Sequence, residues 1–163
     1  MEHGSSRRKP GYPIQPLFLD RWSPRAMSGA ALSETALMTL FEAARWAPSS
    51  GNLQPWRFLY ARRDTDFWPA FFDLLKPSNQ SWAARAGALV VVISRTHFEG
   101  DGRACVTHSY DSGAAWQKLA LQGGLNGRVA PGPEGSACGR ARGGRGVRAA
   151  PWEQAKGGRG HHA

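Results

Sequence analysis

Hydrophobic and polar residues follow helical and strand-like patterns up to about residue 126. Ser33 can cap a helix that has Glu34 in its first turn, where a carboxylate is favourably placed against the helix dipole. The apolar residues of this helix recur at helical spacing: Leu37, Leu40, Phe41 and Ala44. Pro48 marks the end of the helix, because proline cannot continue it and restricts the residue before it.

Two strands are predicted. Residues 56–61 (WRFLYA) form a β-rich run, and residues 88–94 (ALVVVIS) contain unbroken valines that favour a central strand buried on both faces. Between the strands, helical spacing predicts helices over 64–75 and 79–87, with Pro69 in the first turn of the former. Helices that alternate with strands imply layered packing of α and β elements.

A last helix is predicted over residues 108–125. Its sequence, HSYDSGAAWQKLALQGGL, places Ala114, Leu121 and Leu125 on one stripe and leaves Gln117 to face elsewhere. This stripe is expected to pack on the rest of the fold.

Composition favours one folded domain. The chain has 163 residues with 41% hydrophobic residues and seven tryptophans, enough for one sizeable core. No apolar run follows the basic residues 7–9, and the longest such run, 87–93, is far too short to cross a bilayer. We therefore expect a cytoplasmic protein without membrane contact.

The last quarter of the chain differs in composition. Residues 123–163 hold seven Lys and Arg against two Asp and Glu, together with 12 of the 20 glycines. No window beyond residue 128 has sustained hydrophobic periodicity, so we expect 128–163 to be a disordered Gly/Arg-rich tail. A change of reading frame near residues 122–128 would explain this composition, because out-of-frame GC-rich DNA encodes mainly Gly, Arg, Ala and Pro.

The connection APSSGNLQPW, residues 47–56, carries more polar groups than a turn requires. Gly or Asn-Gly alone can supply turn geometry, whereas Ser49, Ser50, Asn52 and Gln54 add four hydrogen-bonding side chains. As isolated residues they are ordinary turn formers. Together they indicate a surface that holds a polar ligand or partner.

Two motifs in this order resemble one family. The stretch RWSPR, residues 21–25, followed by a helix and by residues 47–56, resembles the N-terminal half of the nitroreductase family of FMN-dependent oxidoreductases. The resemblance covers residues 17–127, after a flexible segment 1–16. It implies an α+β fold, a three-layer α/β/α arrangement with a central mixed sheet that is incomplete at the C-terminus.

The resemblance implies an FMN site on residues Arg21, Trp22, Ser23 and Arg25. Arg21 and Ser23 would bind the phosphate and Arg25 the pyrimidine edge of the flavin, since a guanidinium is a planar and permanently charged donor. Without this context, the same residues would be a solvated loop ahead of a helix.

The resemblance further implies that the flavin site is shared across a two-fold homodimer. Pro48, Ser49, Ser50 and Asn52 would reach the flavin of the other subunit. Asn79 would contact the pyrimidine edge; its alternative role is that of a helix N-cap after Pro77 and Ser78. Gln117 would serve packing and dimerisation.

The activity implied is hydride transfer from NAD(P)H through flavin N5 to a small acceptor such as a nitroaromatic or a quinone. The flavin supplies the chemistry, so no catalytic side chain and no metal is assigned. Family elements that complete the flavin site are not recognisable after Gly127. Two alternatives are a non-catalytic folded remnant or dimerisation module, and a nucleic-acid-associated protein that uses its basic tail, for which only non-specific charge attraction is expected.

Overall fold

The computed structural model describes residues 4–127, so the predictions made for the tail 128–163 lie outside the described residues. The elements in chain order are η1 (Gly4–Ser6), α1 (Pro16–Asp20), α2 (Glu34–Arg45), η2 (Ser50–Asn52), β1 (Trp56–Arg62), α3 (Trp68–Phe72), α4 (Pro77–Ala83), β2 (Ala88–Ser94) and α5 (His108–Leu125). None of the helices described is long and apolar enough to span a membrane.

Helix α2 forms as its sequence predicts. The Ser33 side chain accepts a hydrogen bond from the backbone N–H of Ala36 (3.3 Å), which confirms the N-cap. The helix ends at Arg45, and Lys118 of α5 donates from Nζ to the carbonyl oxygen of Trp46 (2.6 Å). A cation at this end satisfies a free carbonyl and fits the helix dipole.

Strands β1 and β2 form an antiparallel pair. The register runs from Trp56 opposite Ser94 to Arg62 opposite Ala88. The prediction that the valine strand is buried on both faces was wrong: every residue of β2 is only partly buried. In the part of the chain that the structure describes, β2 pairs with β1 alone, so neither strand is central.

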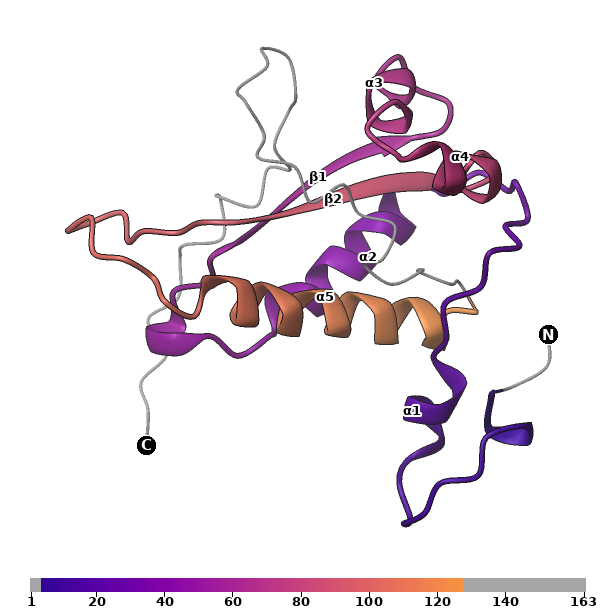
Figure 1. Ribbon diagram of the computed structural model, residues 1–163, viewed down its shortest axis with the longest axis horizontal. Coiled ribbons are helices and arrows are strands. Elements are labelled where there is room, and N and C mark those ends of the chain that lie inside the picture. Colours follow the sequence, from indigo (N-terminus) through magenta and orange to yellow (C-terminus); the bar gives the residue numbers. More distant parts are fainter. Residues whose placement is uncertain (1–3, 128–163) are drawn as a thin grey trace.

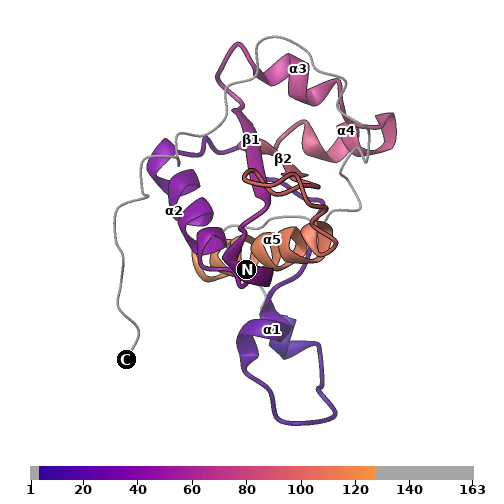
Figure 2. The ribbon, with the colours of Figure 1, turned by 90° about the vertical axis from the view of Figure 1, so that its left-hand side faces the viewer.

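Helices lie on both sides of this pair. Helices α2 and α5 lie along one face, and α3 and α4 lie on the other side, near the end where β1 finishes and β2 begins (Figures 1 and 2). The α+β class and the layered arrangement are therefore confirmed. Over residues 4–127 the expected mixed sheet is reduced to two antiparallel strands, because no parallel neighbour is present there.

Helices α3 and α4 begin and end elsewhere than predicted. Helix α3 spans Trp68–Phe72 instead of 64–75, and α4 spans Pro77–Ala83 instead of 79–87. Proline lies in the first turn of both helices, where its missing N–H costs nothing. Lys76 is extended (ψ 147°) because the ring of Pro77 disfavours helical geometry in the residue before it, which separates the two helices.

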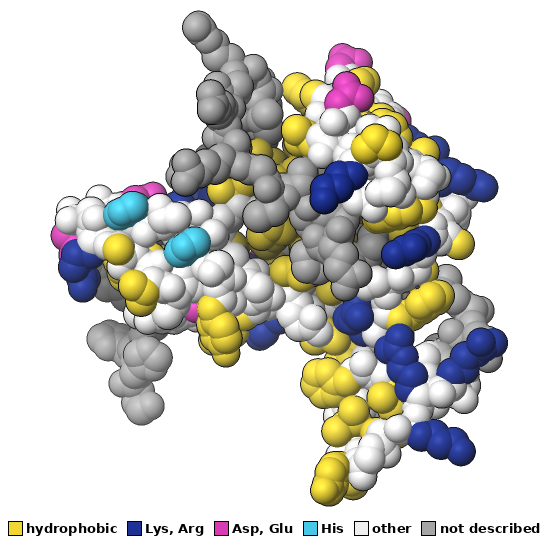
Figure 3. Space-filling model, in the orientation of Figure 1, with side chains coloured by type: hydrophobic (Ala, Val, Ile, Leu, Met, Phe, Trp, Pro, Cys, Tyr) yellow, Lys and Arg dark blue, Asp and Glu magenta, His cyan; other side chains and the backbone are white. Residues whose placement is uncertain are grey.

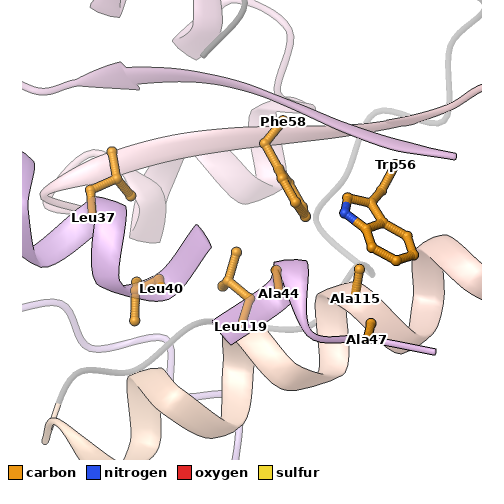
Figure 4. Packing of buried hydrophobic residues seen from close by; sticks show 8 residues of the cluster. All are labelled: Leu37, Leu40, Ala44, Ala47, Trp56, Phe58, Ala115 and Leu119. Atoms are coloured by element: carbon orange, nitrogen blue, oxygen red, sulfur yellow. The ribbon is translucent and has the colours of Figure 1, made fainter. Parts of the chain in front are cut away.

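The hydrophobic core lies between α2, α5 and β1. Figure 4 shows its eight buried residues, with Trp56 and Phe58 from β1 pointing toward the helices: Leu37, Leu40, Ala44, Ala47, Trp56, Phe58, Ala115 and Leu119. Phe41 adds a stacked contact with Phe58, with ring centroids 5.1 Å apart.

The packed stripe of α5 differs from the predicted one. Ala115 and Leu119 face the core, while Leu125 is 65% exposed and Ala114 and Leu121 are only partly buried. Alanines at both 114 and 115 make the two neighbouring stripes nearly equal in hydrophobicity. Contact with α2 decides between them.

Candidate functional site

The predicted residues 21–25 follow directly on helix α1. Arg21 leaves the helix with extended geometry (φ −68°, ψ 120°), and its Nη1 donates to the Ser23 hydroxyl (3.2 Å). Arg8 braces the turn by donating from Nη1 to the carbonyl oxygen of Arg21 (3.2 Å). Pro24 is buried and anchors the segment, whereas Trp22 (41% exposed) and Arg25 are on the surface. The structure therefore groups a guanidinium and a hydroxyl, with a second guanidinium nearby in the chain.

The segment after Arg25 runs along the end of α4. The backbone N–H of Gly29 donates to the carbonyl oxygen of Arg85 (3.1 Å), and Arg85 Nη2 donates back to the carbonyl oxygen of Ser28 (3.0 Å). Gly29 has a φ of 80°, a left-handed geometry that glycine adopts without strain. These bonds hold Ser28 and Gly29 against the residues that follow α4.

Asn79 lies inside α4, so the alternative that it caps this helix is wrong. The N-cap is Lys76, because Pro77 starts the helix two residues earlier than the predicted boundary. Asn79 Oδ1 accepts a hydrogen bond from Trp82 Nε1 (3.3 Å), one turn further along. The carboxamide is thus oriented by the tryptophan, with its nitrogen pointing away from that bond.

The second predicted group, residues 48–52, forms a tight loop around η2. Ser49 Oγ accepts from the backbone N–H of Gln54 (3.0 Å), and its carbonyl oxygen accepts from the N–H of Asn52 (3.0 Å). Gln54 Nε2 in turn donates to Asn52 Oδ1 (3.2 Å). Pro48 and Ser50 are exposed on the outside of the loop.

The backbone of this loop is strained. Gly51, Asn52 and Gln54 have φ values of 58°, 51° and 50°. Asparagine tolerates the left-handed region, but glutamine does so at a cost of about 1–2 kcal/mol. Such geometry persists only where surrounding contacts fix it, and it is frequent at functional sites.

Asp111, which sequence reasoning missed, fixes the loop from outside. It lies in the first turn of α5 and is 3% exposed. Its Oδ2 accepts from the backbone N–H of Ser50 (3.2 Å) and from the hydroxyl of Thr107 (2.9 Å). An acidic residue in a first turn ordinarily indicates helix-dipole stabilisation, so nothing in the sequence connects it with a loop 61 residues earlier.

The two predicted groups lie at opposite ends of α5. The loop that contains η2 lies beside the N-terminal end of α5, and α1 with the segment that follows it lies beside the C-terminal end (Figure 1). Helix α5 has 18 residues, so at 1.5 Å per residue it is about 27 Å long. Within one chain, residues 21–25 thus lie near the C-terminal end of α5, and residues 48–52 lie near its N-terminal end.

Basic and apolar side chains lie on the side of the molecule that carries α1 (Figure 3). Figure 3 shows Lys and Arg side chains along this side of the molecule, with apolar side chains over α1. Large apolar residues of the N-terminal segment are exposed: Tyr12 84%, Ile14 49% and Phe18 55%. This end therefore offers positive charge to an anion and apolar surface to a partner.

A family model and solved structures match this chain. Residues 19–91 match the nitroreductase family model. The structure of an oxidoreductase containing FMN shares 50% identity with a TM-score of 0.71, over 74% of this chain and 62% of that one. No curated protein matches the chain.

More distant structures show the same fold. One from Desulfovibrio desulfuricans, in complex with FMN, has 24% identity and a TM-score of 0.56, over 70% of this chain and 65% of that one. An FMN-dependent nitroreductase from Clostridium difficile R20291 has 20% identity and a TM-score of 0.52, over 66% and 58%. The chain spans less than two thirds of the length of each of these structures. By its family match, its identity to the first structure and its fold, the chain belongs to the nitroreductase family.

Proposed function

We propose that this protein is an FMN-dependent oxidoreductase that works as a homodimer. FMN, when bound, would supply the chemistry of hydride transfer from NAD(P)H to a small acceptor such as a nitroaromatic or a quinone. The observation that carries the proposal is the placement of two polar groups at opposite ends of α5, in a chain 50% identical to an oxidoreductase containing FMN.

The donor set at residues 21–25 fits the anionic parts of FMN. The Arg21 guanidinium and the Ser23 hydroxyl already lie within 3.2 Å of each other, so one phosphate group can accept from both. The exposed guanidinium of Arg25 can serve the pyrimidine edge, whose carbonyl oxygens accept hydrogen bonds. Trp22 adds an exposed aromatic surface beside them.

Asn79 can contribute to the same end of the site. The bond from Trp82 Nε1 to Asn79 Oδ1 orients the carboxamide, whose amide N–H groups can donate to a ligand. These groups suit a carbonyl oxygen of the pyrimidine edge. The role of this chain is to bind and orient the cofactor, and no side chain is assigned as acid or base.

A two-fold dimer would unite the two groups. If two copies of α5 pack antiparallel, residues 48–52 of one subunit approach residues 21–25 of the other. An exposed stripe on α5 supports this packing, with Tyr110, Gly113, Gln117 and Gly124 at helical spacing. Its glycines allow close approach of two helices.

The first experiment is the visible absorption spectrum of the full-length protein after it is mixed with FMN and gel-filtered. A retained flavin band with NAD(P)H-dependent reduction of a quinone is expected. A colourless protein would contradict the flavin-binding role and leave a fold without this activity.

Mixing two damaged variants tests the shared site. We expect Arg21→Ala/Arg25→Ala and Ser50→Ala/Asn52→Ala each to lose activity as homodimers. When equal amounts of the two variants are refolded together and pair at random, half of the dimers are mixed. Each mixed dimer has one intact site out of two, so about one quarter of the wild-type activity should return. If each subunit builds its whole site, every site in the mixture carries a lesion and no activity returns.

A further inference from the structure

The buried carboxylate of Asp111 and the strained loop beside it form a unit. We propose that Asp111 is a positioning residue that holds residues 49–54 in the conformation in which they bind the flavin of the partner subunit. The functional half of this inference rests on the proposed function. The structural half, that Asp111 fixes the loop, stands on contacts within this chain.

The burial of Asp111 needs a reason. A carboxylate that is 3% exposed loses its water shell and must recover hydrogen bonds within the protein. Both donors converge on Oδ2: the N–H of Ser50 at 3.2 Å and the hydroxyl of Thr107 at 2.9 Å. A residue that served only the helix dipole could lie on the exposed side of the same turn. Asp111 instead faces the loop.

The loop needs an external anchor. Its hydrogen bonds at Ser49 and between Gln54 and Asn52 are internal to residues 49–54, and Arg57 Nη1 of β1 holds only its far end, at the carbonyl oxygen of Gln54 (3.2 Å). The bond from Ser50 to Asp111 connects the loop to α5, which packs in the core through Ala115 and Leu119. Gln54 adopts its left-handed geometry at a cost, so without the bond to Asp111 the loop should favour other conformations.

The anchor lies next to the groups assigned to flavin binding. Asp111 binds the backbone of Ser50 and leaves the Ser50 side chain exposed. Asn52, two residues on, is also exposed. Asp111 therefore acts through the loop and does not touch the cofactor. Holding the loop in advance lowers the entropy cost of ligand binding.

The first test measures the loop itself in full-length, FMN-free protein. Amide hydrogen exchange at Ser50, Leu53 and Gln54 is followed by NMR in wild type, Asp111→Ala, Asp111→Asn and Thr107→Val. We expect exchange in Asp111→Ala to rise about ten- to hundredfold, as for loss of a hydrogen bond to a charged group. Asp111→Asn keeps an acceptor oxygen and Thr107→Val keeps the carboxylate, so exchange should rise less in both than in Asp111→Ala. These two variants should fold even if Asp111→Ala does not, and they then carry the test.

Ser112→Ala is the matched control. Ser112 is the next residue and is also buried (6% exposed), and among the described residues its hydroxyl has no hydrogen-bond partner. This substitution alters the same turn of α5 without touching the loop, so exchange at residues 50–54 should stay unchanged. Equal exchange in Asp111→Asn, Thr107→Val and Ser112→Ala would overturn the inference.

The second test measures FMN binding by quenching of flavin fluorescence. The dissociation constant should rise in the order Ser112→Ala, Thr107→Val, Asp111→Asn, parallel to the exchange rates. If wild type binds no FMN, the proposed function fails, and amide exchange still decides whether Asp111 positions the loop. If FMN binds and Asp111→Asn speeds exchange without weakening binding, the inferred role of the loop in flavin binding is wrong.

Discussion

The two ends of α5 are held in different ways. At its N-terminal end, residues 49–54 have a strained backbone that is fixed by internal hydrogen bonds and by buried Asp111. At its C-terminal end, Arg21 donates a hydrogen bond to Ser23, and Trp22 and Arg25 lie on the surface. The first group has its order built into the fold. The second group has a backbone held by Arg8 and by buried Pro24, but side chains that are exposed at Trp22 and Arg25.

Because of this difference, the entropy cost of binding a ligand should differ between the two ends. Long arginine side chains lose rotamer entropy when they bind, and that loss is compensated only by strong, charge-assisted contacts. The loop loses little on binding, because its conformation is already fixed. Substitutions at the loop end should therefore affect stability and binding together, whereas substitutions at the arginine end should affect binding alone.

The largest expected effect is on stability at the loop end. Trp56 follows the loop directly, is 6% exposed and packs with Ala47 and Ala115 (Figure 4). Trp56→Ala should lower the free energy of unfolding by about 3–5 kcal/mol, measured by urea denaturation. Trp22→Ala is the control at the other end and should change it by about 0.5 kcal/mol or less. Similar losses of unfolding free energy in both variants would show that the two ends do not differ in their contribution to stability.

Arg25→Ala tests the other side of the comparison. Loss of one charge-assisted contact should raise the dissociation constant for FMN about ten- to hundredfold. The urea midpoint should not move, because Arg25 lies on the surface. Arg25→Lys keeps the charge but loses the planar fork and should be intermediate. Arg103→Ala, another exposed arginine, should bind FMN as wild type does; unchanged binding in Arg25→Ala would remove this residue from the site.

Strain in the loop is measured by a pair of substitutions at Gln54, whose φ is 50°. Both Gln54→Gly and Gln54→Ala lose the bond to Asn52, but only glycine relieves the left-handed geometry. Gln54→Gly should therefore be more stable than Gln54→Ala by about 1 kcal/mol, after part of the gain is offset by the entropy of glycine in the unfolded chain. A more stable alanine variant would show that the loop is not strained at this position.

The smallest effect is expected at the surface next to the loop. Hydrogen bonds from Arg45 and Trp46 lower the pKa of Glu42 below its ordinary value of 4.5. The resulting stability is present above pH 4.5 and is lost as the pH falls through the lowered value. The side chains of Arg45 and Glu42 are 41% and 54% exposed, so solvent weakens the pair and Glu42→Gln should lower the thermal midpoint only slightly at pH 7. The difference in thermal midpoint from wild type should vanish in acid. A difference that does not change with pH would show that it comes from packing and not from the charge of Glu42.

The sequence predicted those elements whose signals are local. Helix α2 and strands β1 and β2 lie where spacing, capping and valine content place them. The start of α4 was missed because Asn79 was taken as a possible N-cap, whereas Pro77 already occupies the first helical position. Burial of β2 was overestimated, since hydrophobicity reports how apolar a strand is and not how many neighbours it has.

By itself, the sequence determined the family motifs at residues 21–25 and 47–56, the α+β order of elements and the polar character of the loop. Only the tertiary structure decided that the two motifs lie at opposite ends of α5 and that Asp111 anchors the loop. The physical reason is that motifs and periodicities are set by neighbours along the chain. A buried carboxylate, in contrast, finds its partner through packing, and residues 50 and 111 lie together because α2 and α5 pack against each other.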